Sequence, residues 1–167
     1  MEKAHGFTLV ELMVTVAIAA ILLATGLPAM QNFIKDNRIV TATNELVTAL
    51  QLARTAAVQY GTSASVCVSK TQSGCSGSNW RTGWLVWVDK NRNGSRDAGE
   101  EIQYFNALDE NVRVTAPAAA IRYDDRGNVS AGTGSFTICD DRTGETGRRI
   151  NVRITGRVWI ERDVTCS

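Results

Sequence analysis

The stretch His5-Gly6-Phe7-Thr8-Leu9-Val10-Glu11 is followed by an uncharged run that ends at Met30, and this region decides how the rest of the chain can fold. At about 1.5 Å per residue, a helix over residues 7–30 is roughly 36 Å long, which exceeds the roughly 30 Å hydrocarbon core of a bilayer. A secretory signal peptide is the alternative, but its apolar region is only roughly 7 to 15 residues long. The sequence therefore predicts a helix that crosses a membrane and remains in the mature protein.

At these residues the chain resembles a type IV prepilin. In that family a dedicated peptidase cuts after the glycine that matches Gly6, the new amino terminus at Phe7 is methylated, and a glutamate at the place of Glu11 aids assembly. The family's helix commonly carries a proline where Pro28 stands, and we expect a kink there. The resemblance implies a leader over 1–6, a transmembrane and assembly segment over 7–30, and a periplasmic globular domain over 31–167 that includes an amphipathic half of the helix.

An acidic side chain inside an apolar segment needs a physical reason. Insertion scales put its cost at roughly 2.5 to 3.5 kcal/mol. The Phe7 ammonium of a neighbouring subunit would pair with Glu11, because opposite charges 4 Å apart attract by roughly 4 kcal/mol at an effective dielectric constant of 20. The alternative is that Glu11 lies at the level of the lipid headgroups and extends its carboxylate into water.

The composition argues against catalysis. The formal net charge is +1, and the one histidine, His5, lies in the expected leader and would be lost on processing. A mature chain without histidine has no imidazole for proton transfer or metal ligation. Neither a nucleophile elbow nor a phosphate-binding glycine loop is present in the sequence. We therefore expect a protein that is not an enzyme and that needs no cofactor.

The four cysteines lie beyond the apolar segment, which suggests an oxidising compartment such as the periplasm. Four cysteines allow three pairings, and the sequence alone does not choose between them. We favour Cys67 with Cys75, closing a short loop, and Cys139 with Cys166, tying the carboxyl terminus to a strand. Four buried free thiols are the alternative.

The remainder of the chain changes pattern twice. After Pro28 apolar residues recur at helical spacing up to Tyr60, and Gly61 is placed as a helix stop. Short β-prone segments separated by turn residues follow, and Trp84 and Trp87 alternate in one of them, so one of the two could be exposed. The fold predicted is α+β, with one long amino-terminal helix packed against antiparallel sheets as in type IV pilins. The expected strands are Ala64–Ser69, Trp84–Asp89, Ile102–Phe105, Val112–Thr115, Ile121–Tyr123, Ser135–Cys139, Ile150–Thr155 and Val158–Glu161.

One loop has the spacing of a calcium site. Oxygen-bearing side chains alternate, a glycine follows at Gly94, and a late carboxylate could close the shell. Strands are expected to flank the loop instead of helices, and Lys90 and Arg92 dilute its negative charge. The alternative is a polar hairpin loop built from the same residues. The candidate calcium ligands are Asp89, Asn91, Asn93, Asp97 and Glu100.

The last third of the chain is locally basic. Arginines that converge on one edge could hold a nucleic-acid backbone, and an aromatic ring could add a stacking face. The alternative is a solvated sheet face whose arginines pair with nearby acids. The candidate DNA-binding residues are Arg148, Arg149, Arg153, Arg157 and Trp159.

Several further motifs resemble the GspH/FimT family of minor pilins and pseudopilins: Leu52-Ala53-Arg54-Thr55-Ala56-Ala57, Gly83-Trp84, Asp97-Ala98-Gly99-Glu100, Arg122-Tyr123-Asp124 with Gly127, and Gly156-Arg157-Val158. One branch of that family binds DNA through a Gly-Arg-x-Arg motif. Gly156 and Arg157 match this motif, but Trp159 stands at its fourth position. Arg153 or Arg162 could compensate if the fold brings either one alongside Arg157.

The resemblance implies a minor pilin that initiates or caps a type IV pilus as a tip subunit. A DNA-binding minor pilin for DNA uptake and a type II secretion pseudopilin of the H type are the alternatives. The implied partners are other minor and major pilins, a prepilin peptidase, the inner membrane before assembly, and, in the second reading, DNA.

Overall fold

A computed structural model describes residues 8–71 and 73–166. Within them, one long helix α1 is followed by a short 3-10 helix η1 and nine strands. The elements are α1 (Leu9–Tyr60), β1 (Ala64–Val68), η1 (Trp80–Thr82), β2 (Trp84–Val88), β3 (Glu101–Phe105), β4 (Arg113–Thr115), β5 (Ala120–Tyr123), β6 (Val129–Ala131), β7 (Gly134–Cys139), β8 (Gly144–Val152) and β9 (Val158–Cys166).

The chain divides into two compact units, the first ending at Asp36 and the second comprising Asn37–Ser167. Within the first unit α1 runs without a break through Pro28, so this proline does not end the helix, as expected. The kink at Pro28 stays a prediction.

The second unit begins with the amphipathic part of α1. Its buried face consists largely of small and branched apolar side chains, among them Ile39, Leu46, Leu50 and Ala53. Alanines on this face let a sheet approach the helix closely. Tyr60 does not belong to the face, because its side chain is 52% exposed. The helix ends there, and Gly61 follows with φ +61°, as its position in the sequence predicts.

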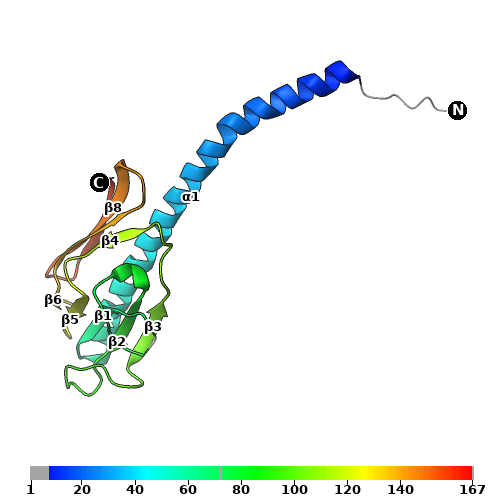
Figure 1. Cartoon of the computed structure of the whole chain (residues 1–167). Helices are drawn as coiled ribbons and strands as arrows, with labels where there is room; N and C mark the ends of the chain where they lie inside the picture. The colour runs from blue at the N-terminus through cyan, green and yellow to red at the C-terminus, as the bar shows by residue number, and fades with distance from the viewer. Residues whose placement is uncertain (1–7, 72, 167) are drawn as a thin grey trace. The chain divides into compact units, whose positions relative to one another are not determined.

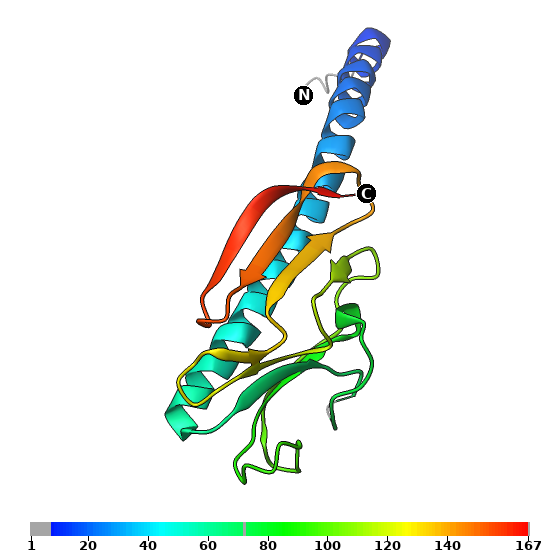
Figure 2. The same ribbon diagram turned by 90° about the vertical axis from the view of Figure 1, so that its left-hand side faces the viewer.

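Two antiparallel sheets pack on this part of the helix. The first has the strand order β3-β2-β1-β5-β6 and the second the order β4-β7-β8-β9. Figures 1 and 2 show the cyan half of α1 lying along one side of both sheets. The core joins residues of the helix and of both sheets. The α+β fold with a long helix and antiparallel sheets is thereby confirmed.

Several strand predictions were wrong in detail, and β9 is five residues longer than expected because it continues past Glu161 to Cys166. The segment expected as Ile150–Thr155 is instead the end of β8, which begins at Gly144 and stops at Val152. Residues 153–157 form a tight turn, since the Arg153 amide donates to the Arg157 carbonyl at 3.0 Å. The three-residue strand β6 was not expected at all.

The tryptophans divide between two clusters. Trp84 stacks on Phe105 with ring centroids 5.6 Å apart, within the main core. Trp87 belongs to a second cluster with Cys67 and Leu85 on the other face of the sheet. It is nevertheless only 3% exposed, so both tryptophans are buried, one on each face of the sheet.

Both disulfides favoured from the sequence are confirmed. Cys67 and Cys75 are bonded with Cα atoms 5.5 Å apart, and Cys139 and Cys166 with Cα atoms 5.8 Å apart. The first closes a loop that begins at the end of β1. The second fastens the end of β9 to β7, so it spans the sheet across β8.

Candidate assembly and binding sites

The amino-terminal motif lies partly outside the described residues, which begin at Thr8 and so exclude Gly6 and Phe7. Thr8 caps α1: its hydroxyl accepts a hydrogen bond from the Glu11 amide at 3.2 Å, and its carbonyl accepts one from the Leu12 amide. Thr8 and Glu11 have the spacing of a capping box. A carboxylate in the first helical turn also interacts favourably with the helix dipole. Glu11 therefore stands at the acidic position of a capping box, and its role in assembly stays a prediction.

The amino-terminal half of α1 has the character of a membrane segment. An 18-residue window in this helix has a mean hydropathy of 2.3 and is not buried within the protein. Large apolar side chains such as Leu9, Leu22 and Leu27 are each more than half exposed. By length and composition, this helix can cross a bilayer.

The hairpin of β8 and β9, with the turn that joins the two strands, carries all five DNA-binding candidates. Register places Arg149 opposite Glu161 and Asn151 opposite Trp159. The Arg153 guanidinium lies 5.2 Å from the centroid of the Trp159 ring. Arg157 lies in the turn just before β9, where its carbonyl accepts a hydrogen bond from the Arg153 amide at 3.0 Å.

The other candidates are placed less favourably for binding. Arg148 pairs in register with Ile138 of β7, next to the Arg149–Thr137 pair, so its side chain points to the opposite face from Arg149. Arg149 forms an ion pair with Glu161 at 3.2 Å. Arg153 is the residue that the fold brings alongside Arg157. The sequence posed this possibility but could not decide it, because it depends on the register of a hairpin.

Arg54 of α1 fixes the position of this hairpin. Its Nε donates to the Gly127 carbonyl at 3.0 Å, and its Nη2 donates to the Thr155 carbonyl at 3.2 Å. One side chain of the helix therefore joins the turn before β6 to the turn between β8 and β9. The sequence analysis did not predict this role. An arginine next to the buried residues Ala53 and Ala57 could have indicated that its side chain contacts the packed sheets.

Two glycines allow this close approach. A Cβ added at Gly156 would lie 2.0 Å from the Gly127 carbonyl oxygen and 2.7 Å from the Arg54 Nε. Both glycines have positive φ, +79° at Gly127 and +73° at Gly156. Gly156 must therefore be a glycine, because the backbone of the neighbouring turn occupies the space of a Cβ atom.

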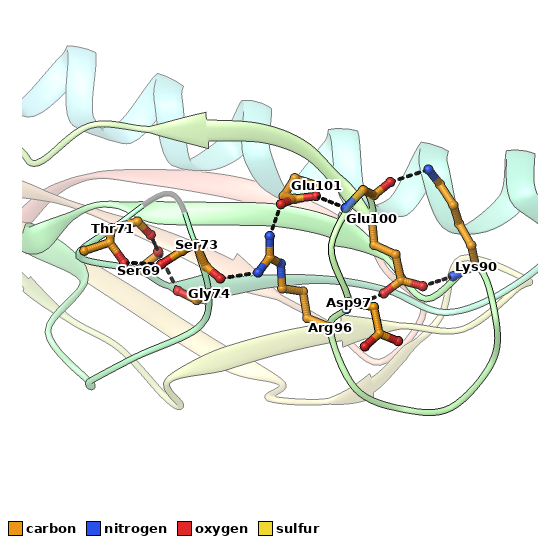
Figure 3. A network of polar contacts seen from close by, with 10 residues as sticks. Ser69, Thr71, Ser73, Gly74, Lys90, Arg96, Asp97, Glu100 and Glu101 are labelled. Atoms are coloured by element: carbon orange, nitrogen blue, oxygen red, sulfur yellow. Dashed lines mark hydrogen bonds and ion pairs between the residues drawn. The ribbon is translucent and has the colours of Figure 1, made fainter.

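The calcium candidates lie in the loop between β2 and β3, where the two outer carboxylates accept hydrogen bonds from the backbone. Asp89 is buried and accepts from the amides of Asn93 at 3.0 Å and Gly94 at 2.8 Å. Glu100 accepts from the amides of Lys90 and Asp97, each at 2.8 Å. Figure 3 shows Glu100 reaching across the loop to both. These contacts hold the loop closed.

The middle of the loop is also hydrogen-bonded internally. Asn91 and Asn93 donate their side-chain amides to one oxygen of Asp97, at 2.7 and 2.6 Å. These bonds hold the pKa of Asp97 below its usual value. Among the described residues, no group of three or more His, Cys, Asp and Glu side chains gathers as metal ligands. Calcium binding by this loop stays a prediction, and the polar hairpin loop accounts for the observed contacts.

The fold and the amino-terminal helix define a class of protein: an α+β protein of the pilin type whose first helix is long and apolar enough to cross a membrane. Residues 1–27 match the family described as "Prokaryotic N-terminal methylation motif", and residues 42–156 match the family described as "Type II transport protein GspH". The second match covers more than half of the chain. The chain therefore belongs to the GspH family of minor pilins and pseudopilins.

Curated relatives resemble only one part of the chain. "Prepilin peptidase-dependent protein D" of Escherichia coli (strain K12) is 57% identical over 35 residues, which are 21% of this chain and 24% of that protein. A "Probable minor fimbrial protein" of Dichelobacter nodosus is 49% identical over 39 residues, 23% of this chain and 24% of that protein. The chain thus spans about a quarter of the length of the curated relatives it matches.

A solved structure resembles most of the chain in fold. The crystal structure of the type IV minor pilin FimU from Pseudomonas aeruginosa superposes with a TM-score of 0.60 and 18% sequence identity. The match covers 78% of this chain and 93% of that chain. This likeness confirms the pilin-like fold expected from the sequence.

Proposed function

We propose that this protein is a minor type IV pilin that initiates or caps pilus assembly as a tip subunit. The observation that carries the proposal is the presence of a methylation motif and a GspH domain on one chain, matched over residues 1–27 and 42–156. In this proposal a prepilin peptidase cuts after Gly6, and Phe7 becomes the methylated amino terminus. The globular unit then lies in the periplasm before it enters the pilus, where other pilins are its partners.

Assembly would be driven by the exposed apolar side chains of α1. In a membrane these side chains contact lipid, and in a filament the helices of neighbouring subunits would cover them. The Glu11 carboxylate would pair with the Phe7 ammonium of a neighbour, which offsets the roughly 2.5 to 3.5 kcal/mol cost of an acid in an apolar setting. No substrate is turned over in this mechanism, so we propose a structural and not a catalytic role.

Processing is the first test of this proposal. Gly6→Leu should leave the protein unprocessed in the membrane, longer than the mature form by the leader. Gly26→Leu is the matched control, because a Cβ at Gly26 meets no atom within 4 Å, and this variant should be cut normally. A mature-sized Gly6→Leu protein would refute the prepilin interpretation. Glu11→Gln should be processed but fail to enter pili.

DNA binding is a second candidate function, favoured by the exposed hairpin that places Arg153 beside Arg157 and Trp159. The full chain in nonionic detergent, titrated with duplex DNA, should bind with an affinity that falls with salt by a logarithmic slope of roughly 0.9 per phosphate contact. Arg157→Ala should weaken binding and reduce this slope, whereas the exposed Lys70→Ala should change little. Equal binding by both variants, or none at low salt, would reject this function.

Calcium binding can be tested with the same full chain in nonionic detergent. If the loop of Asp89 and Glu100 binds the ion, added calcium should raise the melting temperature and a chelator should reverse the rise, because a ligand of the folded state stabilises it by mass action. Asp97→Asn, which removes the charge in the middle of the loop, should abolish the calcium effect. An unchanged melting temperature would leave the loop as a polar hairpin loop only.

A further inference from the structure

A cavity of about 620 Å³ lies on the face of the first sheet that is opposite the helix. Its floor is a row across three strands, since Ser65 of β1 pairs in register with Trp87 of β2 and with Arg122 of β5. The disulfide loop contributes Cys75, and the loop before β3 contributes Arg96. The volume falls within the roughly 300 to 1,000 Å³ typical of small-molecule sites.

Arg122 is held in place at the floor of this cavity. Its Nε donates to the Ser65 hydroxyl at 3.3 Å, and its Nη2 donates to the Gly94 carbonyl at 3.0 Å. Its guanidinium lies 5.7 Å from the centroid of the Trp87 ring. Within the described part of the chain no carboxylate forms an ion pair with Arg122, and its partners leave the charge uncompensated. An ordered, partly buried cation of this kind suits an anionic group.

Trp87 supplies an unused hydrogen-bond donor beside Arg122. Its side chain is 97% buried, being only 3% exposed, yet its Nε1 has no acceptor within residues 8–71 and 73–166. The indole of Trp80 behaves differently, because its Nε1 donates to the Ala118 carbonyl at 2.8 Å. Trp87 therefore lines the cavity with its ring, while its Nε1 is buried beneath that surface.

Arg96 forms one wall and joins the two loops that border the cavity. It donates to the Ser73 carbonyl in the disulfide loop and to the Glu101 carboxylate, as Figure 3 shows. Its Nε, like the Trp87 Nε1, is buried without an acceptor in the described structure. The wall is therefore built by specific contacts, and it presents a second guanidinium to the cavity.

The lining combines donors with apolar surface. Ser65, Arg96 and Arg122 supply donors, and Trp87, the Cys67–Cys75 disulfide and Ala120 supply apolar area. Of the described residues that line the cavity, none is acidic. We propose that this cavity binds a small organic carboxylate, with the anionic group on Arg122 and the apolar body against Trp87 and the disulfide. This inference is independent of pilus assembly and of the Arg153–Trp159 hairpin.

The test uses the full chain, labelled with 15N in nonionic detergent, and benzoate as the probe. The indole N–H signals are resolved by assigning Trp87 through Trp87→Phe. Benzoate should shift the Trp87 signal in a saturable manner at millimolar concentrations or below, and should leave the Trp80 signal in place. Benzamide, a neutral molecule of the same shape, should bind at least tenfold more weakly.

Two arginine variants complete the test. Arg122→Gln should weaken benzoate binding at least tenfold, and Arg153→Gln, which removes a charge from the other sheet, should leave it unchanged. Arg122→Lys keeps the charge and separates loss of the anion contact from loss of the fold, with the Trp80 signal reporting that the core is intact. A Trp87 signal that does not move, equal binding of benzamide, or unchanged binding by a folded Arg122→Gln would overturn the proposal.

Discussion

At the scale of single residues, Gly156 shows how a motif glycine acts through its surroundings. Its own conformation requires a positive φ, but so do those of Gly99 and Gly61. What distinguishes Gly156 is the Gly127 carbonyl oxygen and the Arg54 guanidinium, which occupy the space a side chain would need. A comparison of Gly156 with Gly99 can therefore separate the cost of backbone strain from the cost of steric clash.

Gly156→Ala should destabilise the protein by about 3 kcal/mol or more, because about 1 kcal/mol of strain at positive φ adds to the displacement of Arg54 and of the neighbouring turn. Gly99→Ala is the matched control. Its φ is +83° and a Cβ there meets no atom within 4 Å, so only the strain should appear. Urea unfolding measures both, and an equal loss in the two variants would contradict the close contact.

Tyr123 has a buried hydroxyl without a partner in the described residues, and burial raises the pKa of this phenol to about 12 from the usual 10.0. Between these two values the unfolded chain has released a proton that the folded chain keeps, so the free energy of unfolding falls as pH rises from 10 to 12. Below that window the contribution is fully present.

Tyr123→Phe should therefore flatten the decline of stability across this alkaline range. At neutral pH it should be neutral or slightly stabilising, by up to about 1 kcal/mol, because it removes an unpaired buried hydroxyl. Tyr60→Phe, at a tyrosine that is 52% exposed, controls for the loss of a phenol hydroxyl elsewhere on the protein. Unfolding by urea at a series of pH values measures the slope, and parallel profiles for wild type and Tyr123→Phe would refute the prediction.

At the scale of elements, the helix was the most predictable part of the chain. Its apolar run, its buried face at helical spacing and its stop at Gly61 all follow from local sequence. The strand β6 and the start of β8 do not. The segment Gly144–Arg149 is polar and rich in glycine, and its extended form comes from pairing with β7 and β9. Short strands of this kind are imposed by their neighbours.

The candidate sites, too, were predictable only where local sequence determines them. The basic residues of the hairpin could be named from composition, but their partners could not. Arg149 pairs with Glu161 on the neighbouring strand, whereas among the described residues no carboxylate pairs with Arg153. The two Arg54 contacts join residues 73 and 101 positions apart, and no sequence periodicity predicts such contacts. The cysteine pairs were favoured but not fixed by the sequence, because four cysteines allow three pairings.

The two disulfides should contribute unequally to stability. Their sequence separations are 8 for Cys67–Cys75 and 27 for Cys139–Cys166. In the loop-entropy account these correspond to about 2.5 and about 3.5 kcal/mol. Replacing Cys139 and Cys166 together by alanine should thus cost about 1 kcal/mol more than replacing Cys67 and Cys75, as measured by urea unfolding. A larger loss for the short loop would show that contacts, and not chain entropy, dominate.

At the scale of the whole molecule, apolar surface is distributed in two ways. In the first unit the large apolar side chains are exposed, whereas in the second they form a core from Ile39 onward. The exposed apolar side chains of the first unit are shielded from water only by lipid or by other subunits. The apolar side chains of the second unit shield one another. Folding and assembly are therefore expected to depend on different parts of one chain.

This division predicts that the second unit folds without the first. A fragment that begins at Asn37 retains every described core residue, and it keeps the ion pair of Arg38 with Asp109 at 3.3 Å. Its unfolding midpoint in urea should equal that of the globular unit within the full chain in nonionic detergent. A fragment that begins at Asn44 is the control. It lacks Ile39 and Ala42, both nearly fully buried, and should lose at least about 2 kcal/mol because a core side chain is removed. An Asn37 fragment without a cooperative transition would show that the membrane half of the helix is needed for folding as well as for assembly.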